Sequence, residues 1–489
     1  MKGVGFVKRF ICGFMALVMC ICVVAFWRVW ADEGVTYYDN LSGFTTQPMV
    51  AAGANHTIAL RDDGTVWTWG ANWGGQLGDS TAVHSSSYPK QVPNLYNVVA
   101  VAAGGHYTVA LKSDGSVWDW GYALDAQYSG SRYTPKQVPN LYNIVAIAAG
   151  GHYMGWNNEG WHQTFALTSD GTVWAWGYNG NGQLGDGTTI RRTSPVKVPN
   201  LYNVIAIATG GGHTVALRDN GTVWAWGANW LGQLGDGTTT QSSTPVHVPN
   251  LYNVIAIAAG EGHTIALRRD GTVWAWGNNG NGRLGDGTTI ARSYPVQAQL
   301  YDVVAIDAGH AHSIALRRDG TVWAWGNNGN GQLGDGTTMA RSSPVQVPNL
   351  YNIVAVATRG GHNISIRRDG ILWAWGANAW GQLGDGTATR SYMPTQVVGT
   401  DGVGYFKIID NASEYILLPT PPPQFVPGDV NGDGVVTSAD VALLRAYLAG
   451  FPLAINHEAA DVNGDGQVTA ADLTLLRAYL AGFPVTLGR

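Results

Sequence analysis

The sequence contains little charge and almost no cysteine. Charged residues make up 12% of the 489 positions, and the formal net charge is −5. The three cysteines, Cys12, Cys20 and Cys22, all lie close to the N-terminus. The chain beyond residue 31 therefore cannot hold a disulfide framework, which excludes the class of small cysteine-stapled secreted domains. No basic face is evident in the sequence, so we expect no nucleic acid as a partner.

A recognisable catalytic set is also lacking. Glu159, Glu261 and Glu414 are single acidic residues in unrelated parts of the chain. No Ser/His/Asp group or metal-ligand group stands outside the repeats that dominate the sequence. We therefore predict no catalytic residues. The alternative is a hydrolase acting on polysaccharide, whose side chains converge from different repeats.

The first 31 residues have the pattern of an export signal. Lys2, Lys8 and Arg9 form a positively charged start, an apolar run follows at 10–27, and residues 29–31 offer a cleavage site. Because this run is close to the length that spans a bilayer, an uncleaved membrane anchor is the alternative. The segment carries four positive charges and no negative one. Cleavage would leave a secreted chain with a net charge near −9.

Glycine and tryptophan, in contrast, are abundant, with 67 and 21 residues. One stretch, residues 254–289 (VIAIAAGEGHTIALRRDGTVWAWGNNGNGRLGDGTT), recurs with small edits along most of the chain. Histidines 49 to 56 residues apart mark seven copies, and such a period is typical of propellers and other arrays. They are His56, His106, His162, His213, His263, His312 and His362. In the third copy His152 is an alternative marker, because about ten extra residues precede His162.

Each copy predicts four short strands. In the stretch above, apolar runs at 254–258 and 264–267 predict the first two strands, and residues 272–276 predict the third. Residues 295–297 predict a weaker, proline-led fourth strand at the outer edge. Asp270-Gly271 predicts a two-residue type I′ hairpin, in which both residues have positive φ. Four strands at this period fit a propeller blade, so seven copies predict an all-β, seven-bladed β-propeller.

The run from Gly262 to Gly285, GHTIALRRDGTVWAWGNNGNGRLG, resembles the RCC1 (regulator of chromosome condensation) repeat. The resemblance implies a seven-bladed β-propeller over residues 48–418, but it implies no single function. Relatives include nucleotide-exchange factors, chromatin binders and a secreted bacterial β-lactamase inhibitor. Residues 405–418 repeat half a unit after the last full copy, and we expect them to take part in closing the ring.

Residues that break the repeat are the candidate ligand contacts of the propeller. Most tryptophans belong to the Trp-x-Trp pairs and are expected in the core. The seven histidines are expected to hydrogen-bond neighbouring turns, and turns such as 179–187 lack the spacing of a calcium loop. Outside these patterns stand Trp73, Trp156, Trp161, Trp230 and Trp380. They could stack on a glycan or anchor a protein, and packing between blade rims is the alternative.

The character of the chain changes after a proline-rich linker at 419–427. Residues 429–440, DVNGDGVVTSAD, place oxygen-bearing side chains at the spacing of an EF-hand-type calcium loop. The pattern recurs 32 residues later, and the sequence LLRAYLAGFP follows each copy as a predicted helix. The predicted calcium ligands are Asp429, Asn431, Asp433, Val435 through its carbonyl, Thr437, Asp440, Asp461, Asn463, Asp465, Gln467, Thr469 and Asp472.

Residues 428–489 resemble a type I dockerin, a small all-α module with two EF-hand-like calcium loops. Aspartate at the twelfth loop position is typical of that family. The resemblance implies that two calcium ions fold the module and that its partner is the cohesin domain of a scaffoldin. It also implies a set of cohesin-binding residues, namely Ser438, Ala439, Leu444, Arg445, Ala470, Ala471, Leu476 and Arg477.

The sequence thus predicts five segments. They are a signal peptide at 1–31, a lead-in at 32–47, the propeller at 48–418, the linker at 419–427 and the dockerin at 428–489. We expect a secreted component of an extracellular, cellulosome-type complex, with a membrane contact only if the signal is uncleaved. The propeller is expected to bind a protein or glycan without catalysis. The alternatives are a polysaccharide-degrading enzyme and a secreted enzyme inhibitor delivered by the same dockerin.

Overall fold

The computed structural model describes the propeller region and parts of the C-terminal region. The described residues are 46–122, 130–151, 162–400, 402–409, 430, 436, 438–449, 460, 462 and 468–480. The chain divides into two compact units, Met1–Ala412 and Ser413–Arg489, and each is considered by itself. The predicted signal peptide, the linker and residues 410–418 lie outside the described residues. No described helix has the length and apolar character needed to cross a membrane.

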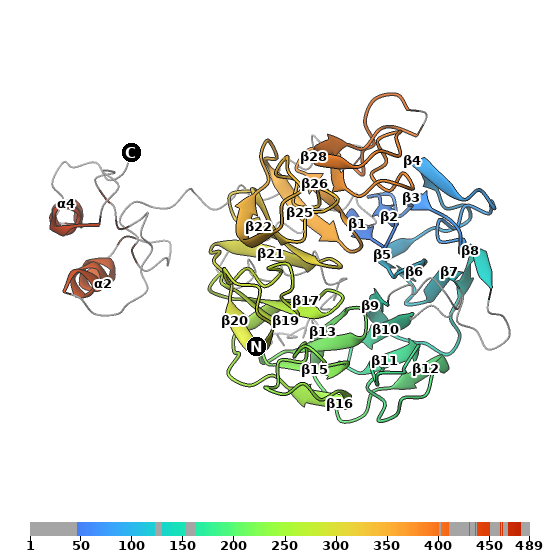
Figure 1. Ribbon diagram of the computed structural model, residues 1–489, viewed down its shortest axis with the longest axis horizontal. Helices are drawn as coiled ribbons and strands as arrows, with labels where there is room; N and C mark the ends of the chain where they lie inside the picture. Colours follow the sequence, from blue (N-terminus) through green and yellow to red (C-terminus); the bar gives the residue numbers. More distant parts are fainter. Residues whose placement is uncertain are drawn as a thin grey trace, which may run out of the picture. The chain divides into compact units, whose positions relative to one another are not determined.

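The first unit is a ring of seven four-stranded antiparallel sheets, as the sequence predicts (Figure 1). Each blade consists of four strands that are consecutive in the chain. Blade one contains β1 (Met49–Ala52), β2 (His56–Leu60), β3 (Val66–Ala71) and β4 (Ser85–Gln91). Blade two contains β5 (Val98–Ala103), β6 (Tyr107–Lys112), β7 (Val117–Tyr122) and β8 (Ser131–Gln137). Blade three contains β9 (Ile144–Gly150), β10 (Gln163–Thr168), β11 (Val173–Gly177) and β12 (Arg192–Lys197).

The remaining four blades follow the same pattern. Blade four contains β13 (Val204–Thr209), β14 (His213–Arg218), β15 (Val223–Gly227) and β16 (Ser242–His247), and blade five contains β17 (Val254–Ala259), β18 (His263–Arg268), β19 (Val273–Gly277) and β20 (Arg292–Gln297). Blade six contains β21 (Val303–Ala308), β22 (His312–Arg317), β23 (Val322–Gly326) and β24 (Arg341–Gln346). Blade seven contains β25 (Ile353–Thr358), β26 (His362–Arg367), β27 (Leu372–Gly376) and β28 (Ser391–Gln396). The first strand of each blade lines the centre of the ring, and the fourth lies at its periphery (Figure 1).

The second tryptophan of each Trp-x-Trp pair joins neighbouring blades. Trp276 is fully buried, and its Nε1 donates a hydrogen bond to the carbonyl of Gln233 in the preceding blade, at 3.0 Å. Trp69 in blade one makes the same bond to Gln382 in blade seven, at 3.0 Å. A buried indole N–H needs an acceptor, and the turn of the preceding blade supplies it. The core role predicted for these tryptophans follows from this geometry.

The Asp-Gly hairpins differ from the predicted type I′ turns. Gly271 has a φ of +75°, but Asp270 does not share this left-handed conformation. The amide of Gly271 donates to the carbonyl of Arg268, and the amide of Arg268 donates to that of Thr272, both at 3.0 Å. This is a type I turn followed by a glycine bulge. The Asp270 carboxylate accepts hydrogen bonds from the backbone and the hydroxyl of Thr272, which holds the aspartate in that turn.

The ring closes by direct packing of blade seven against blade one, and among the described residues no blade takes strands from both ends of the chain. Residues 402–409, which include the described part (405–409) of the predicted half unit, cover this seam. Phe406 is buried and packs edge-on against Trp67 and Trp69 of blade one, with ring centroids 5.3 and 5.9 Å away. The same segment hydrogen-bonds both blades, since Ile408 accepts from the amide of Asp62 and donates to Gly370. It contributes isolated bridges to the seam rather than two further strands.

The described part of the second unit contains two helices, α2 (Ser438–Leu448) and α4 (Ala470–Leu480). They pack against each other around a small core. Its fully buried members are Val430, Leu444, Ala460, Val462 and Leu476. This matches the expected small all-α module after the propeller.

Candidate functional sites on the propeller and the C-terminal module

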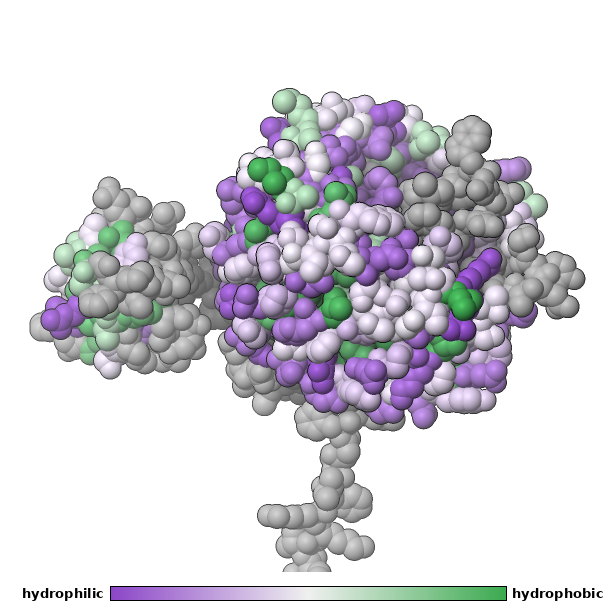
Figure 2. Space-filling model, turned by 60° about the horizontal axis from the view of Figure 1, so that its bottom comes forward, coloured by the Kyte–Doolittle hydropathy of each residue, from purple (hydrophilic) through white to green (hydrophobic). Residues whose placement is uncertain are grey.

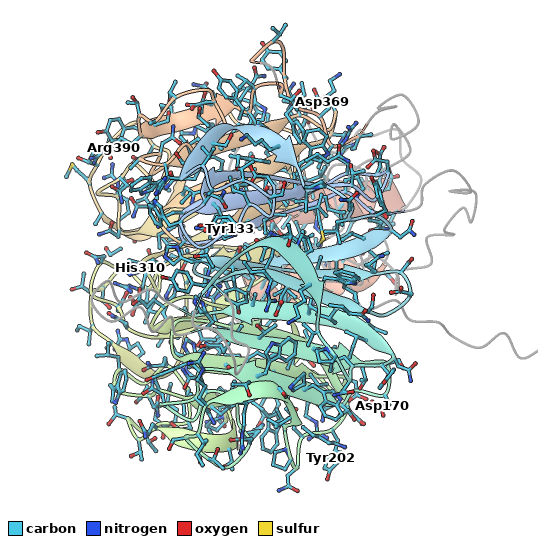
Figure 3. All side chains as sticks on the ribbon, turned by 90° about the vertical axis from the view of Figure 1, so that its right-hand side faces the viewer. Tyr133, Asp170, Tyr202, His310, Asp369 and Arg390 are labelled. Carbon is cyan, nitrogen blue, oxygen red and sulfur yellow. The ribbon has the colours of Figure 1, made fainter. Side chains whose placement is uncertain are left out.

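The repeat-breaking residues of the propeller gather on one face. In an antiparallel blade, the connections between strands one and two and between strands three and four leave at the same end. Glu261, His310 and Arg359 lie in the first kind of connection, whereas Trp73, Trp230 and Trp380 lie in the second. We call this end of the ring the variable face. Figure 3 shows His310 on one side of the ring and the hairpin residues Asp170 and Asp369 on the other.

At the centre of the ring runs an apolar cavity of about 90 Å³. It is lined by the first strands of all seven blades, with Asp307 as its charged member. The Asp307 carboxylate accepts hydrogen bonds from its neighbour Ala308 and from the amide of Thr358, at 2.8 and 2.7 Å. Arg359 replaces the glycine found at this place in blades four to six. Its guanidinium donates to the carbonyls of Ala149, Thr209 and Gly151, at 3.1, 3.5 and 3.2 Å.

Arg359 therefore bridges the cavity mouth from blade seven to blades three and four. Because carbonyl groups carry no net charge, they do not neutralise the Arg359 guanidinium, and a positive charge remains at the centre of the variable face. Beside it, His310 of blade six pairs with the carboxylate of Glu261 in blade five. Arg283 lies beneath this pair and donates from Nη1 to the carbonyl of His310 at 3.3 Å. Burial lowers the pKa of Arg283, and the nearby Glu261 carboxylate opposes that shift.

Two of the predicted platform tryptophans meet at the seam between blades seven and one. The rings of Trp73 and Trp380 are perpendicular, with centroids 4.2 Å apart, and the Trp380 residue is 37% exposed. Trp73 also approaches the imidazole of His106, at 5.6 Å between centroids. Trp230 is 59% exposed and makes no ring contact with another described aromatic residue. Trp156 and Trp161 lie outside the described residues.

The residue that starts the second strand of each blade reaches across to the next blade. His213 Nε2 lies 2.9 Å from Thr264 Oγ1, and His263 Nε2 lies 3.0 Å from Ser313 Oγ. In blades two and three this register position belongs to Tyr107 and Gln163. The predicted markers His106 and His162 come one residue earlier, so their assignment was wrong. The error arose because the blades align on the polar residue that follows this position, a threonine or serine in blades one to six and Asn363 in blade seven, and its spacing from the histidine varies.

Burial keeps these imidazoles uncharged. It lowers the pKa of His213 and His312 to about 4, and that of His362 to about 3. It also lowers the pKa of His162 to about 3, and this ring stacks against Tyr122, with centroids 5.9 Å apart. A base that protonates only near pH 3 to 4 is a poor proton acceptor at neutral pH. His213, His312 and His362 therefore act as neutral hydrogen-bonding groups between blades.

The glycine-rich turns use their own oxygens internally. Asn279 Nδ2 donates to the Asp286 carboxylate and to the carbonyls of Thr288 and Ile290, all within 3.1 Å. Its Oδ1 accepts from the amide of Leu284 at 3.0 Å. Among the described residues, no group of three or more His, Cys, Asp or Glu side chains is arranged to hold a metal ion. These turns are closed by asparagine and aspartate side chains.

The predicted calcium ligands lie mostly outside the described residues. This applies to Asp429, Asn431, Asp433, Val435, Thr437, Asp461, Asn463, Asp465 and Gln467. Asp440 and Asp472, at the twelfth positions of the two loops, are fully buried at the starts of α2 and α4. Asp472 Oδ2 accepts hydrogen bonds from the amide and hydroxyl of Thr469, at 2.8 and 3.1 Å. Because a buried carboxylate needs hydrogen bonds or a counter-charge, both aspartates fit a calcium site at each loop.

The predicted cohesin-binding residues divide into two groups. Ser438, Arg445, Ala470, Ala471 and Arg477 are exposed on the helices, and the side chain of Ala439 lies outside the described part. Leu444 and Leu476, in contrast, are fully buried in the core between α2 and α4. A surface role for these two leucines is contradicted, because the interhelix contact already uses their side chains. The near-identical sequences of α2 and α4 do not show which face of each helix packs in the core between them.

Comparisons with known proteins agree with this architecture. The family model described as RCC1-like domain matches residues 157–412, and that of the RCC1 repeat matches 63–111. The model described as dockerin type I domain matches residues 427–481. Prp20p from Saccharomyces cerevisiae has a crystal structure that is 25% identical, with a TM-score of 0.60, covering 75% of this chain and 95% of that chain.

Two curated proteins are similar over part of their length. The ultraviolet-B receptor UVR8 of Arabidopsis thaliana is 31% identical over 174 residues, which cover 34% of this chain and 38% of the receptor. Protein pim1 of Schizosaccharomyces pombe is 29% identical over 211 residues, which cover 37% of this chain and 39% of pim1. The matched parts thus span less than half the length of either relative.

Proposed function

Since this chain belongs to the RCC1-like domain family and carries a C-terminal type I dockerin, we propose that it is a secreted, cohesin-docking component of a cellulosome-type complex. Its propeller acts there as a non-catalytic module that binds a protein or a glycan. The observation that carries this proposal is the combination of a regular propeller, whose irregular residues lie on one face, with a separate docking module. Such a component would contribute to polysaccharide breakdown by recognition rather than by turnover.

Calcium holds the docking module together in this proposal. Type I dockerin domains generally bind calcium, and we propose one ion in each loop. The ligands are the predicted set, in which Asp440 and Asp472 contribute buried carboxylates at the helix starts. The small apolar core between α2 and α4 provides little stability alone, so the bound ions would supply a large part of it.

The cohesin partner is proposed to contact the exposed residues near the helix starts and the outward side of both helices. Ser438, Arg445, Ala470, Ala471 and Arg477 belong to that surface. Arginine suits such an interface, because its guanidinium forms directed hydrogen bonds and its stem covers apolar surface. The two buried leucines hold the helices in position for it.

The variable face is the proposed ligand-binding surface of the propeller. Trp73 and Trp380 form a perpendicular corner at the blade seven to blade one seam, and Arg359 and the Glu261–His310 pair lie toward the axis. Aromatic side chains provide large, rigid contact areas for sugars and for protein side chains alike. Trp230 offers a second, isolated contact on the same face.

Binding of the full-length protein to arrays of soluble glycans and of proteins from polysaccharide-degrading secretions tests this assignment. The double variant Trp73→Ala/Trp380→Ala should lose the bound ligand, and Trp230→Ala tests the second proposed contact separately. Unchanged binding by the double variant would contradict the assignment of the seam. Capture of one secreted hydrolase with inhibition of its activity would favour the inhibitor alternative. Polysaccharide turnover by the wild-type protein would overturn the non-catalytic reading.

A further inference from the structure

One repeated residue of the propeller is exposed instead of buried. The connection from each blade to the next carries the sequence Asn-Leu-Tyr-Asn or a close variant, and its leucine is buried while its tyrosine faces solvent. The six tyrosines and their exposed fractions are Tyr96 55%, Tyr142 75%, Tyr202 59%, Tyr252 56%, Tyr301 62% and Tyr351 58%. The repeated histidine and tryptophan positions have a structural explanation in blade packing. Blade packing does not explain a repeated tyrosine that leaves more than half of its surface in water.

These tyrosines lie on the face opposite the variable face. Connections between blades leave at the same end as the Asp-Gly hairpins, because the strands alternate in direction. Figure 3 shows Tyr202 on the side of Asp170 and Asp369, away from His310. Blade seven is the last blade in the chain, and in the segment after it Tyr405 is 55% exposed and forms an isolated bridge with Val398. We call the six tyrosines of the inter-blade connections the tyrosine ring.

The backbone holds each tyrosine rigidly. In the connection after blade four, Asn250 and Asn253 both have left-handed conformations, with φ of 59° and 57°. Leu251 anchors the turn in the core, and the carbonyl of Asn253 accepts the amide of Arg269 from the next hairpin at 2.9 Å. Asparagine is among the few residues that adopt this conformation readily. The side chain of Tyr252 is thus presented from a fixed turn, which lowers the entropy lost when it binds a ligand.

Equivalent positions in a ring of similar blades lie at the same height along the ring axis. The tyrosine ring is therefore a planar set of aromatic side chains around a disc-shaped face. Between the tyrosines, basic side chains cover the partly exposed first tryptophans of the Trp-x-Trp pairs, as Arg268 does over Trp274 at 5.8 Å. Exposed aspartates of the hairpins, such as Asp270 and Asp319, offset those charges. The face thus carries exposed aromatic side chains and charges of both signs.

We propose that the tyrosine ring binds the flat surface of an insoluble, uncharged polysaccharide. Pyranose rings present apolar C–H faces that stack on aromatic side chains, and a flat array of such faces matches a planar array of tyrosines better than a single chain does. Several weak contacts on one rigid frame act together, so their combined affinity far exceeds that of each. The choice of polysaccharide rests on the proposed function, which places the protein among enzymes acting on such material. Because the hairpin aspartates offset the basic side chains, the face lacks the strong positive charge that would attract an anionic membrane.

Adsorption of the full-length protein to microcrystalline cellulose tests the proposal. We expect the wild type to adsorb, and the triple variant Tyr202→Ala/Tyr252→Ala/Tyr301→Ala to lose affinity by roughly tenfold or more, because multivalent contacts weaken together. The matched triple Tyr→Phe variant should retain adsorption, since stacking needs the ring and not the hydroxyl. The double variant Ile290→Ala/Met339→Ala removes two exposed apolar side chains at the opposite end of the ring and should adsorb like the wild type.

Three outcomes would overturn the proposal. The first is wild-type adsorption that the triple alanine variant retains, and the second is no wild-type adsorption to the solid. The third is tyrosine-dependent binding to vesicles of anionic phospholipid in place of cellulose. Failure of the proposed function is recognised separately, because it appears as lost cohesin binding or as unchanged soluble-ligand binding by the variable-face variant.

Discussion

His362 Nε2 lies 2.9 Å from Thr57 Oγ1, although 305 residues separate the two positions in the chain. This bond joins the last blade to the first and repeats the contact between His213 and Thr264 within the ring. The seam is therefore built like the other blade interfaces, with Phe406 added over it. A closed ring without a shared blade depends on such side-chain contacts to hold its ends together.

Loss of the closing hydroxyl should cost as much as loss of an internal one. We expect Thr57→Val to lower the free energy of unfolding by about 1–3 kcal/mol, because it leaves buried polar partners unsatisfied. Thr264→Val is the matched control and should give a loss of similar size. Urea unfolding followed by tryptophan fluorescence measures both. If Thr264→Val lowers the urea midpoint and Thr57→Val leaves it unchanged, contacts other than the bond between His362 and Thr57 hold the two ends of the ring together.

The segment over the seam should contribute stability through Phe406. Replacement by alanine removes a buried ring packed on Trp67 and Trp69, and we expect a loss of about 3 kcal/mol. Amide hydrogen exchange should rise first in blades one and seven. Tyr405→Ala, one residue away and exposed, is the control and should leave exchange unchanged. Equal protection in both variants would mean that residues 402–409 do not clamp the seam.

The buried histidines should make the propeller sensitive to acid. Their folded-state pKa lies below the unfolded value near 6.5, as with His213 at about 4. Between these pH values the unfolded chain binds the proton and the folded chain does not, so stability falls as pH falls through that window. The stability that the neutral histidines contribute is fully present at pH values above the unfolded-state pKa. Each such group contributes a slope of up to about 1.4 kcal/mol per pH unit.

His213→Gln tests this effect with a substitution that the protein itself uses, since Gln163 occupies the same position in blade three. Glutamine does not titrate and can still donate across the interface, as Gln163 does to Thr209 at 2.9 Å. We expect near-normal stability at pH 8 and a smaller loss between pH 6.5 and 4. Urea unfolding at several pH values gives the slope. An unchanged slope would remove His213 as a source of the acid sensitivity.

Much of the fold could be predicted from the repeat, because each copy carries its own turns and its own buried face. The type I′ assignment failed because Asp-Gly alone does not select the turn. Thr272, two residues after the aspartate, captures its carboxylate and favours the type I turn. The register in blades two and three failed because histidine was used as the marker. Thr108 and Thr164, which occupy the place of Thr57, are the signal that could have corrected it.

The candidate sites were less predictable, since exposure depends on tertiary packing. Sequence reasoning could suggest that Trp73 and Trp380 share a rim, because blades one and seven are neighbours in a closed ring. It could not find Arg359 bridging the cavity mouth, which requires the positions of three distant carbonyls. It also misses the tyrosine ring, because a residue that repeats in nearly every blade suggests a structural role. The burial of each leucine and the exposure of the tyrosine beside it distinguish a repeated structural residue from a repeated surface residue.

Removal of calcium should unfold the C-terminal module and leave the propeller intact. The carboxylates of Asp440 and Asp472 are fully buried and would lose the cation that we propose beside them. Circular dichroism should show a loss of helical signal in EDTA, while the tryptophan fluorescence of the blades stays unchanged. Persistence of the helical signal in EDTA would contradict calcium-dependent folding.

The most direct test of the account is calorimetric titration of the full-length protein with a type I cohesin domain. We predict saturable binding in calcium, and no detectable binding in EDTA or for the Asp440→Ala/Asp472→Ala variant. The Trp73→Ala/Trp380→Ala variant should bind the cohesin like the wild type, because it changes only the propeller. Undiminished cohesin binding in EDTA, or no binding in calcium, would contradict the central claim that this propeller is a calcium-dependent docking component.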